Sequence, residues 1–165
     1  MLSLFCAACG FQPMYGSYSE AKANGRAGIQ AQLARIEVAN IKDREGQILR
    51  NALIDRFYQE GRPVDARYTL QVSDIAEATD DLDITITSDA TRAQLKLSTV
   101  MTLVDNETNA VVLERGLKAV ASYNIMNSEF ATRVSEKNVR ENALKDLARQ
   151  IERHLALYFN NNDSL

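Results

Sequence analysis

The hydrophobic residues of this chain follow two periods, one typical of helices and one typical of half-buried strands. Two segments have apolar residues at helical spacing: roughly seventeen residues from Asp43, which Gly61 and Pro63 should end, and a longer run over 131–159. Alternating apolar and polar residues occupy 35–39, 67–75, 82–87, 94–104 and 111–123. Such alternation predicts strands with one apolar face, as in a sheet that is covered on one side only.

The order of these segments predicts one α+β domain, assigned to residues 33–160. We expect a two-layer sandwich, in which two helices pack on one face of a mainly antiparallel sheet of four to five strands. Residues 9–32 are rich in Gly, Ala and Ser without apolar periodicity, which predicts a flexible tether. Residues 161–165 are expected to form a disordered tail.

The two longest alternating segments predict a hairpin whose register follows from their apolar faces. If Asp105 faces Asn109 across the turn, Leu97 faces Leu117 and Lys96 faces Lys118. A slip of one residue would place apolar side chains opposite lysines, so the pattern fixes which residues share a face. A slip of two residues would keep the faces intact and therefore stays open.

The composition excludes several classes of function. The net charge of −3 argues against nucleic acid as a partner. The sequence contains no run of about eighteen apolar residues, the length that a membrane-spanning helix needs. Since His154 is the only histidine and both cysteines lie near the start, no nucleophile–histidine pair or conventional metal site can form. The run Asp80, Asp81 and Asp83 lacks the glycine and distal glutamate of a calcium loop and is interpreted as a solvated turn. We therefore expect no enzyme, no metal and no dissociable cofactor.

The start of the chain carries a signal of its own. An apolar run ends in Ala7, Ala8 and Cys9, and small residues before a cysteine suit cleavage by a bacterial lipoprotein signal peptidase. Residues 1–8 are then the remnant of a signal peptide, and Cys9 carries diacylglycerol and acyl chains such as palmitate. Because this run is short and no basic residue precedes it, we expect the precursor to begin further upstream. Two alternatives stay open: a ragged apolar terminus, and a redox pair of Cys6 with Cys9.

The residues from Cys9 onwards resemble the start of mature LptE-type lipoproteins, the lipopolysaccharide-assembly lipoproteins of the Gram-negative outer membrane. The likeness is to the alphaproteobacterial branch, with the pattern Cys-Gly-Phe-x-Pro-x-Tyr-Gly; this chain has Cys9-Gly10-Phe11-Gln12-Pro13-Met14-Tyr15-Gly16. Shorter similarities follow in order: Tyr68-Thr69-Leu70, Arg92-x-x-Leu95-x-Leu97, Ala121-Ser122-Tyr123-Asn124, Ser128-Glu129-Phe130-Ala131 and Leu155-Ala156-Leu157-Tyr158-Phe159.

This resemblance implies a non-enzymatic role. LptE-type proteins form a heterodimer with the β-barrel LptD, plug its lumen, assist its assembly and bind lipopolysaccharide during transport to the cell surface. It also implies a position at the outer membrane, on the periplasmic side, with Cys9 as the lipid attachment site. Two alternatives stay open: a periplasmic lipoprotein that carries or chaperones an amphiphile or another envelope protein, and an enzyme of envelope metabolism.

The predicted hairpin suggests where an anionic ligand could bind. In the expected register Lys96 and Lys118 face each other on the polar side of the sheet, and Arg92 lies further along the same face. Directly opposed like charges repel unless an anion lies between them. Arg92, Lys96 and Lys118 are therefore candidate ligands for the phosphates of lipid A, although the lysines could simply extend into solvent. Residues 87–91 are candidate contact points for the barrel.

Overall fold

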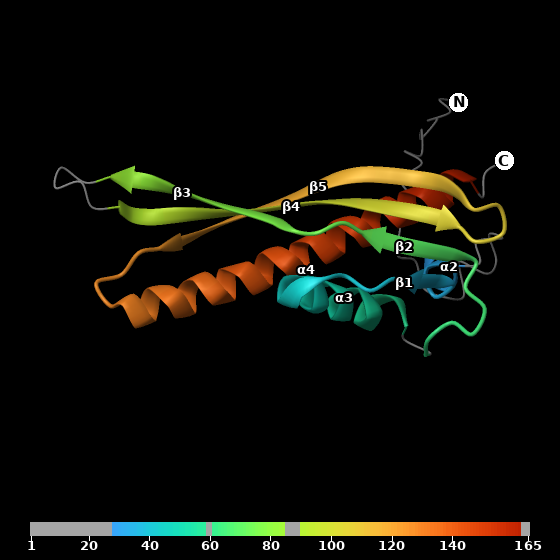
Figure 1. Ribbon diagram of the computed structural model, residues 1–165, viewed down its shortest axis with the longest axis horizontal. Helices are drawn as coiled ribbons and strands as arrows, with labels where there is room; N and C mark the ends of the chain where they lie inside the picture. Colours follow the sequence, from blue (N-terminus) through green and yellow to red (C-terminus); the bar gives the residue numbers. More distant parts are fainter. Residues whose placement is uncertain (1–27, 59–60, 85–89, 163–165) are drawn as a thin grey trace, which may run out of the picture.

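A twisted sheet of five strands forms one layer of the protein, and helices cover one face of it (Figure 1). The computed structural model describes residues 28–58, 61–84 and 90–162. Within these residues the order of elements is α2 (Ile29–Leu33), β1 (Ile36–Val38), α3 (Asp43–Phe57), β2 (Tyr68–Val72), β3 (Ala76–Ile84), β4 (Ala90–Asp105), β5 (Ala110–Asn124) and α4 (Glu129–Asn162). The predicted α+β sandwich is confirmed, with α2 as an additional short helix.

Strand β4 is the centre of the sheet. From Arg92 to Asp105 it pairs with β5 on one side. On the other side β3 pairs with its first half and β2 with its second half, and all these pairings are antiparallel. Strand β1 continues the sheet beyond β2 in the parallel direction. At the break between β2 and β3, the Ser73 hydroxyl accepts the N–H of Val100 at 2.9 Å and lies 3.0 Å from the Thr99 hydroxyl. The Ser73 side chain thus provides a hydrogen-bond partner for a backbone N–H of β4 at the point where the neighbouring strand changes from β2 to β3.

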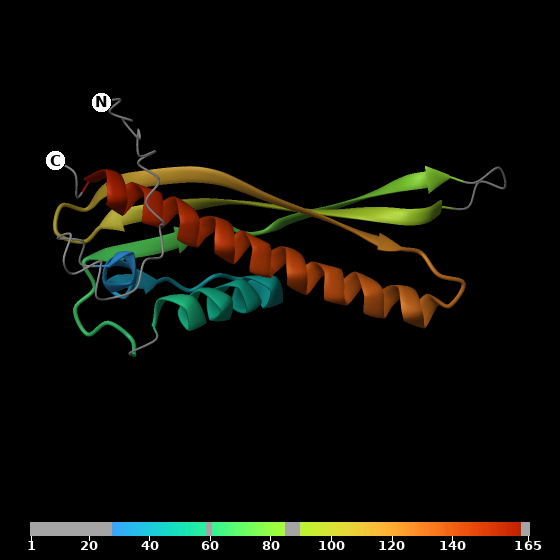
Figure 2. The same ribbon diagram turned by 180° about the vertical axis from the view of Figure 1, so that it is seen from behind.

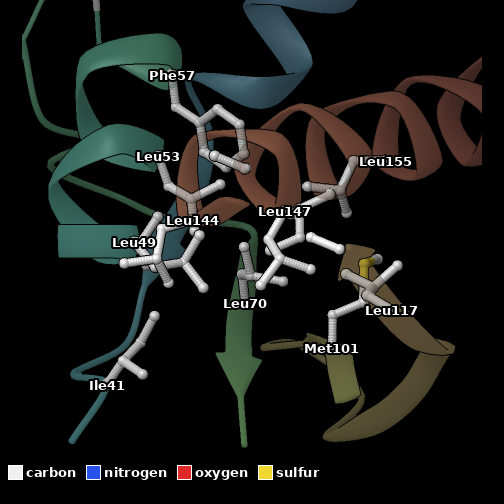
Figure 3. Close-up of a cluster of buried hydrophobic side chains, with 14 of the residues drawn as sticks. Ile41, Leu49, Leu53, Phe57, Leu70, Met101, Leu117, Leu144, Leu147 and Leu155 are labelled. Atoms are coloured by element: carbon white, nitrogen blue, oxygen red, sulfur yellow. The ribbon is translucent and has the colours of Figure 1, made fainter. Parts of the chain in front are cut away.

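The hydrophobic core lies between the sheet and the helices, where α3 and the second half of α4 meet (Figure 3). Alternate residues of β4 enter it, and Leu95, Leu97 and Met101 are fully buried. From α4 the buried stripe contains Leu144, Leu147, Ile151 and Leu155, as the helical spacing predicts. Each such side chain contributes about 1.5–3 kcal/mol of burial free energy, so this shared core holds the two layers together.

The molecule is elongated because three strands and α4 continue beyond helix α3 (Figures 1 and 2). We call this extension the distal arm and define it as residues 76–84, 90–98, 118–124 and 129–142. Helix α4 has 34 residues, which corresponds to a length of about 50 Å. Helix α2 and the C-terminal end of α4 lie at the opposite end of the molecule from the distal arm.

Three segments differ from the sequence-based expectation. Strand β3 begins at Ala76, well before the predicted 82–87, because pairing with β4 compensates for the low strand propensity of Ala, Glu and Asp. Asp80 and Asp81 therefore lie in a strand and not in a turn. Helix α2 occupies part of the predicted tether, since Leu33 is buried and Ile29 packs against the core. The last turn of α4 reaches Asn162, within the predicted tail.

The β4–β5 register differs from the predicted one by two residues. Leu97 pairs with Ala119 and not with Leu117, so the predicted sharing of faces is right and the predicted partners are wrong. One residue of the shift comes from the loop, because Asp105 pairs with Ala110 and not with Asn109. The other comes from an irregularity between Leu103 and Val104. Two single-residue changes add up to an even shift, which preserves the alternation of the faces.

The turn itself explains the longer loop. The Asp105 carboxylate accepts backbone N–H bonds from Glu107 at 2.8 Å and Thr108 at 3.3 Å. Asn109 has a φ of 55°, the left-handed conformation that asparagine tolerates well. Burial opposes ionisation of Asp105, but hydrogen bonds from Arg67, Glu107 and Thr108 outweigh it and lower its pKa. A charged aspartate therefore organises this loop.

Candidate functional site

None of the described elements covers the face of the sheet opposite the helices, and this face carries the cationic residues that the sequence singled out. Because the apolar residues of β4 point toward α4, its alternate residues point away from the helices; among them Arg92 and Val100 are exposed and Lys96 is half-buried. On β5 the corresponding residues include the exposed Lys118 and Val120. We call this side of the sheet the open face.

The observed register separates the two lysines. Lys96 pairs with Val120, and Lys118 pairs with Ser98, so the lysines are diagonal neighbours and not directly opposed. Diagonal side chains stand farther apart than direct partners, which weakens their repulsion. The prediction that Lys96 faces Lys118 is therefore wrong, and the direct opposition from which the anion site was inferred does not occur.

Lys96 is also neutralised from the other side. Its ammonium forms an ion pair with the Asp80 carboxylate of β3, and the two side chains are 32% and 50% exposed. This partner was not anticipated, because Asp80 was interpreted as part of a solvated turn. A lysine with a neighbouring carboxylate adds little net positive charge to the open face.

Arg92 and Lys118 are more exposed than Lys96. Both are exposed, and neither forms an ion pair with a side chain of residues 28–58, 61–82 or 92–162. Arg92 pairs across the sheet with Asp83 of β3, whereas Lys118 has no acidic cross-strand partner. Arg92 pairs with Asn124 at the distal end of β5, and Lys118 lies at the other end of the same segment. The structure thus places all three predicted cations on one face and separates them by their surroundings: Lys96 is paired with Asp80, Arg92 has Asp83 as its cross-strand partner, and Lys118 has neither.

Two further expectations fall wholly or partly outside the described residues. Cys9 lies before the first described residue, so the acylation site stays a prediction. Of the predicted barrel contacts at 87–91, only the last two residues belong to a described element, as the start of β4.

On the opposite side of the sheet, an ion-pair network holds α4 to the distal arm. Arg140 donates to both carboxylate oxygens of Glu77 at 2.6 and 2.8 Å, and also to Glu136 at 2.6 Å. The hydrogen bond from Arg140 lowers the pKa of Glu77, and burial opposes this effect. Burial, together with Glu136 and Asp81, raises the pKa of the nearby Tyr123. Sequence reasoning missed this network, since Glu77 and Arg140 are 63 residues apart.

His154 occupies the position that helical spacing predicted, half-buried on α4. Burial, followed by the positive charges of Arg153 and Arg115, lowers its pKa. These effects favour the neutral imidazole at neutral pH. The residue is therefore a packed helix residue.

A shallow hollow of about 270 Å³ lies beside β1. Charged and polar groups line much of it; the lining residues are Glu37, Val38, Arg50, Tyr58, Arg62, Pro63, Val64 and Ala66. The Tyr58 hydroxyl already bonds to the backbone of β1, accepting from Val38 at 3.0 Å and donating to Ile36 at 2.8 Å. This surface is too polar to enclose an acyl chain.

No helix within the described residues is both long enough and apolar enough to cross a membrane. Comparison with known proteins gives the family: residues 33–155 match LptE, described as lipopolysaccharide assembly. The chain belongs to the LptE family. This LptE-family protein is thus a lipopolysaccharide-assembly lipoprotein, and the resemblance seen in the sequence is confirmed.

Solved structures with the same fold support this assignment. A lipoprotein candidate from Caulobacter crescentus is 25% identical, with a TM-score of 0.62 over 81% of this chain and 97% of that one. Rare lipoprotein B from Shewanella oneidensis is 11% identical, with a TM-score of 0.61 over 78% and 96% of the two chains. A minor lipoprotein from Acinetobacter baumannii is 23% identical, with a TM-score of 0.54 over 74% and 88%. The last two show the fold alone. Among curated proteins, no sequence matches the chain.

Proposed function

We propose that this LptE-family protein is anchored at the periplasmic side of the outer membrane by acyl chains on Cys9. It plugs the lumen of an LptD-type β-barrel, assists assembly of that barrel and binds lipopolysaccharide during transport to the cell surface. The family match over residues 33–155 is the observation that carries this proposal.

The shape of the domain supports a plug. Helix α4, at about 50 Å, is longer than the roughly 30 Å hydrocarbon core of a bilayer. A rod of this length, inserted end-on, would fill a barrel across the membrane. The open face is rich in polar side chains, which suits contact with the polar interior of a wet barrel. The role requires shape and many modest contacts and no reactive group.

The open face supports the binding of lipopolysaccharide phosphates at Arg92 and Lys118. Both cations are exposed on an otherwise acidic protein with a net charge of −3. Lys96 belongs to the same surface but is offset by Asp80. We therefore assign the principal phosphate contacts to Arg92 and Lys118 and a lesser one to Lys96. A carrier for an amphiphile is the weaker alternative, because the hollow beside β1 has a charged lining.

Affinity purification of the tagged chain from solubilised outer membrane tests the proposal. We expect a β-barrel partner in equimolar amount, together with lipopolysaccharide. A Cys9→Ala variant is the matched control: it should lose membrane attachment and still bind the purified barrel, since the anchor does not form the plug. Recovery of lipopolysaccharide without any barrel would instead identify a carrier and would overturn the plug. Mass spectrometry of the native protein should show diacylglycerol and acyl chains on Cys9.

A further inference from the structure

The outer edge of β5 in the distal arm has the features of a binding site for an extended peptide. In an antiparallel pair, the backbone groups of alternate residues point toward the partner strand and those of the others point away. The carbonyl of Val100 accepts the N–H of Ser73, so the backbone N–H and C=O groups of the even-numbered residues of β4 point away from β5. Since Leu97 pairs with Ala119, the backbone groups of the odd-numbered residues of β5 bond to β4. Those of the even-numbered residues point toward the outer edge of the sheet.

Helix α4 protects only one of these outward groups. The Gln150 side chain donates to the carbonyl of Lys118 at 3.0 Å, which caps the edge at this point. Beyond it, Val120, Ser122 and Asn124 are exposed, and their outward N–H and C=O groups have no hydrogen-bond partner within the described part of the chain. This edge therefore offers a row of free donors and acceptors.

The same segment has none of the features that usually prevent edge pairing. Between Lys118 and Asn124 there is no charged residue, glycine or proline, and the β4–β5 pairing there is regular. The other free edge of the distal arm, on β3, contrasts with it. There the residues whose backbone groups point to the outer edge include the charged Glu77 and Asp81, and the pairing with β4 is irregular beside Asp83. Charged residues and irregular pairing therefore disfavour strand addition at the edge of β3, whereas the edge of β5 from Lys118 to Asn124 has neither between its ends.

We propose that the edge of β5 from Lys118 to Asn124 binds an extended segment of a partner protein as an additional antiparallel strand. Exposed cations stand at both ends of the segment on the open face: Lys118 at one end, and Arg92, which pairs with Asn124, at the other. Charge complementarity therefore favours a partner strand that is uncharged and β-branched in its centre and acidic at both ends.

A second copy of this chain fits less well. Antiparallel pairing of two β5 edges centred on Ala121 would place Lys118 of each copy beside Asn124 of the other, and therefore close to Arg92. Cations would then approach cations at both ends of the interface, which opposes association. The inference concerns strand recognition, and it stands whether or not the barrel and lipopolysaccharide roles proposed above are correct.

The test uses the full chain labelled with ¹⁵N and a synthetic heptapeptide, acetyl-Asp-Thr-Val-Thr-Val-Thr-Asp-amide, followed by NMR. We expect the amide signals of Val120, Ser122 and Asn124 to shift on titration and to gain protection from hydrogen exchange. The matched peptide control carries N-methyl groups on its two valines, which removes the donors facing β5; it should bind at least about fivefold more weakly. N-methylation of the second and fourth residues, which face away, should have little effect. A peptide with lysine at both ends should bind more weakly than the acidic one.

Variants of the protein complete the test. Ser122→Pro removes one outward N–H without touching the β4–β5 ladder, so it should weaken binding of the acidic peptide at least about fivefold. Thr79→Pro makes the same change on the outer edge of β3 and should leave binding unchanged. An absence of shifts, shifts confined to β3, or equal binding of the N-methylated peptide would overturn the proposal. Shifts of the β5 amides that depend on protein concentration without peptide would point to a second copy and would also overturn it.

Discussion

Arg140 on α4 donates two hydrogen bonds to the carboxylate of Glu77 on β3, from Nε to Oε2 at 2.8 Å and from Nη2 to Oε1 at 2.6 Å. The contact lies in the distal arm, where α4 has passed the fully buried part of the core. A bidentate ion pair fixes the relative orientation of the two side chains as well as their distance. It therefore fixes how closely the helix follows the sheet just before the buried stripe of α4 begins at Ala143.

Arg140→Ala should destabilise the distal arm more than the core. The expected loss is about 1 kcal/mol of unfolding free energy, since both side chains remain partly in contact with water that screens the pair. Urea unfolding measures the global loss, and hydrogen exchange should rise in β3 before it rises in β2. The control is Arg133→Ala, which breaks an exposed pair with Glu129 on the same helix and should cost less than about 0.5 kcal/mol. Equal effects of the two variants would contradict the structural role of Arg140.

The same pair predicts a dependence of stability on pH. Because Arg140 lowers the pKa of Glu77 in the folded state, the folded protein binds fewer protons at this site than the unfolded one. Its stabilising contribution is complete above the unfolded pKa of about 4.3 and is lost as the pH falls through the lower folded value. The difference in urea midpoint between the natural protein and Glu77→Gln should therefore be largest near neutral pH and shrink in acid. A constant difference over this range would exclude Glu77 as the titrating group.

Gly46 in α3 should not tolerate a larger side chain. A Cβ at this position would lie 2.6 Å from Cγ2 of Ile41 and 3.0 Å from its carbonyl carbon, so the loop before the helix would have to move. We expect Gly46→Ala to lower the unfolding free energy by about 1–3 kcal/mol. Gly116→Ala is the control, because nothing lies within 4 Å of a Cβ there; its effect should stay within about 0.5 kcal/mol. Thermal or urea unfolding distinguishes the two.

Asn109 should accept glycine and reject a β-branched residue. Its φ of 55° lies in the left-handed region, where a β-branched side chain meets the backbone. Asn109→Val should therefore cost about 1–2 kcal/mol, whereas Asn109→Gly should leave the unfolding midpoint nearly unchanged. An equally stable valine variant would show that the loop can adopt another conformation.

The cations of the open face should contribute unequally to lipopolysaccharide binding. Lys118→Glu combined with Arg92→Glu should weaken it at least about tenfold, as two exposed positive charges become negative. Lys96→Ala should have a much smaller effect, because Asp80 already offsets Lys96. Binding to immobilised lipopolysaccharide, with circular dichroism to confirm folding, measures this order. A larger loss for Lys96→Ala would show that the Lys96–Asp80 pair opens to receive the ligand.

The alternation of apolar residues was enough to predict the layers and which side chains share a face, because the period of a strand or helix is a local property. Leu95 and Leu97 enter the core as predicted. The family was also visible in the sequence, since it depends on the order of short motifs. The partners of individual residues were not, because pairing is decided by loops and irregularities that alternation does not encode. The exchange of Leu117 for Ala119 opposite Leu97 came from one extra loop residue and one bulge.

The ion pairs required the tertiary structure for the same reason. Asp80 forms an ion pair with Lys96, and Glu77 forms one with Arg140, only because β3 starts earlier than its polar sequence predicts. The sequence determined that Arg92, Lys96 and Lys118 point to one side of a sheet. Only the fold decided how exposed each of them is and which carboxylates of β3 lie beside it, because the strand register sets these distances.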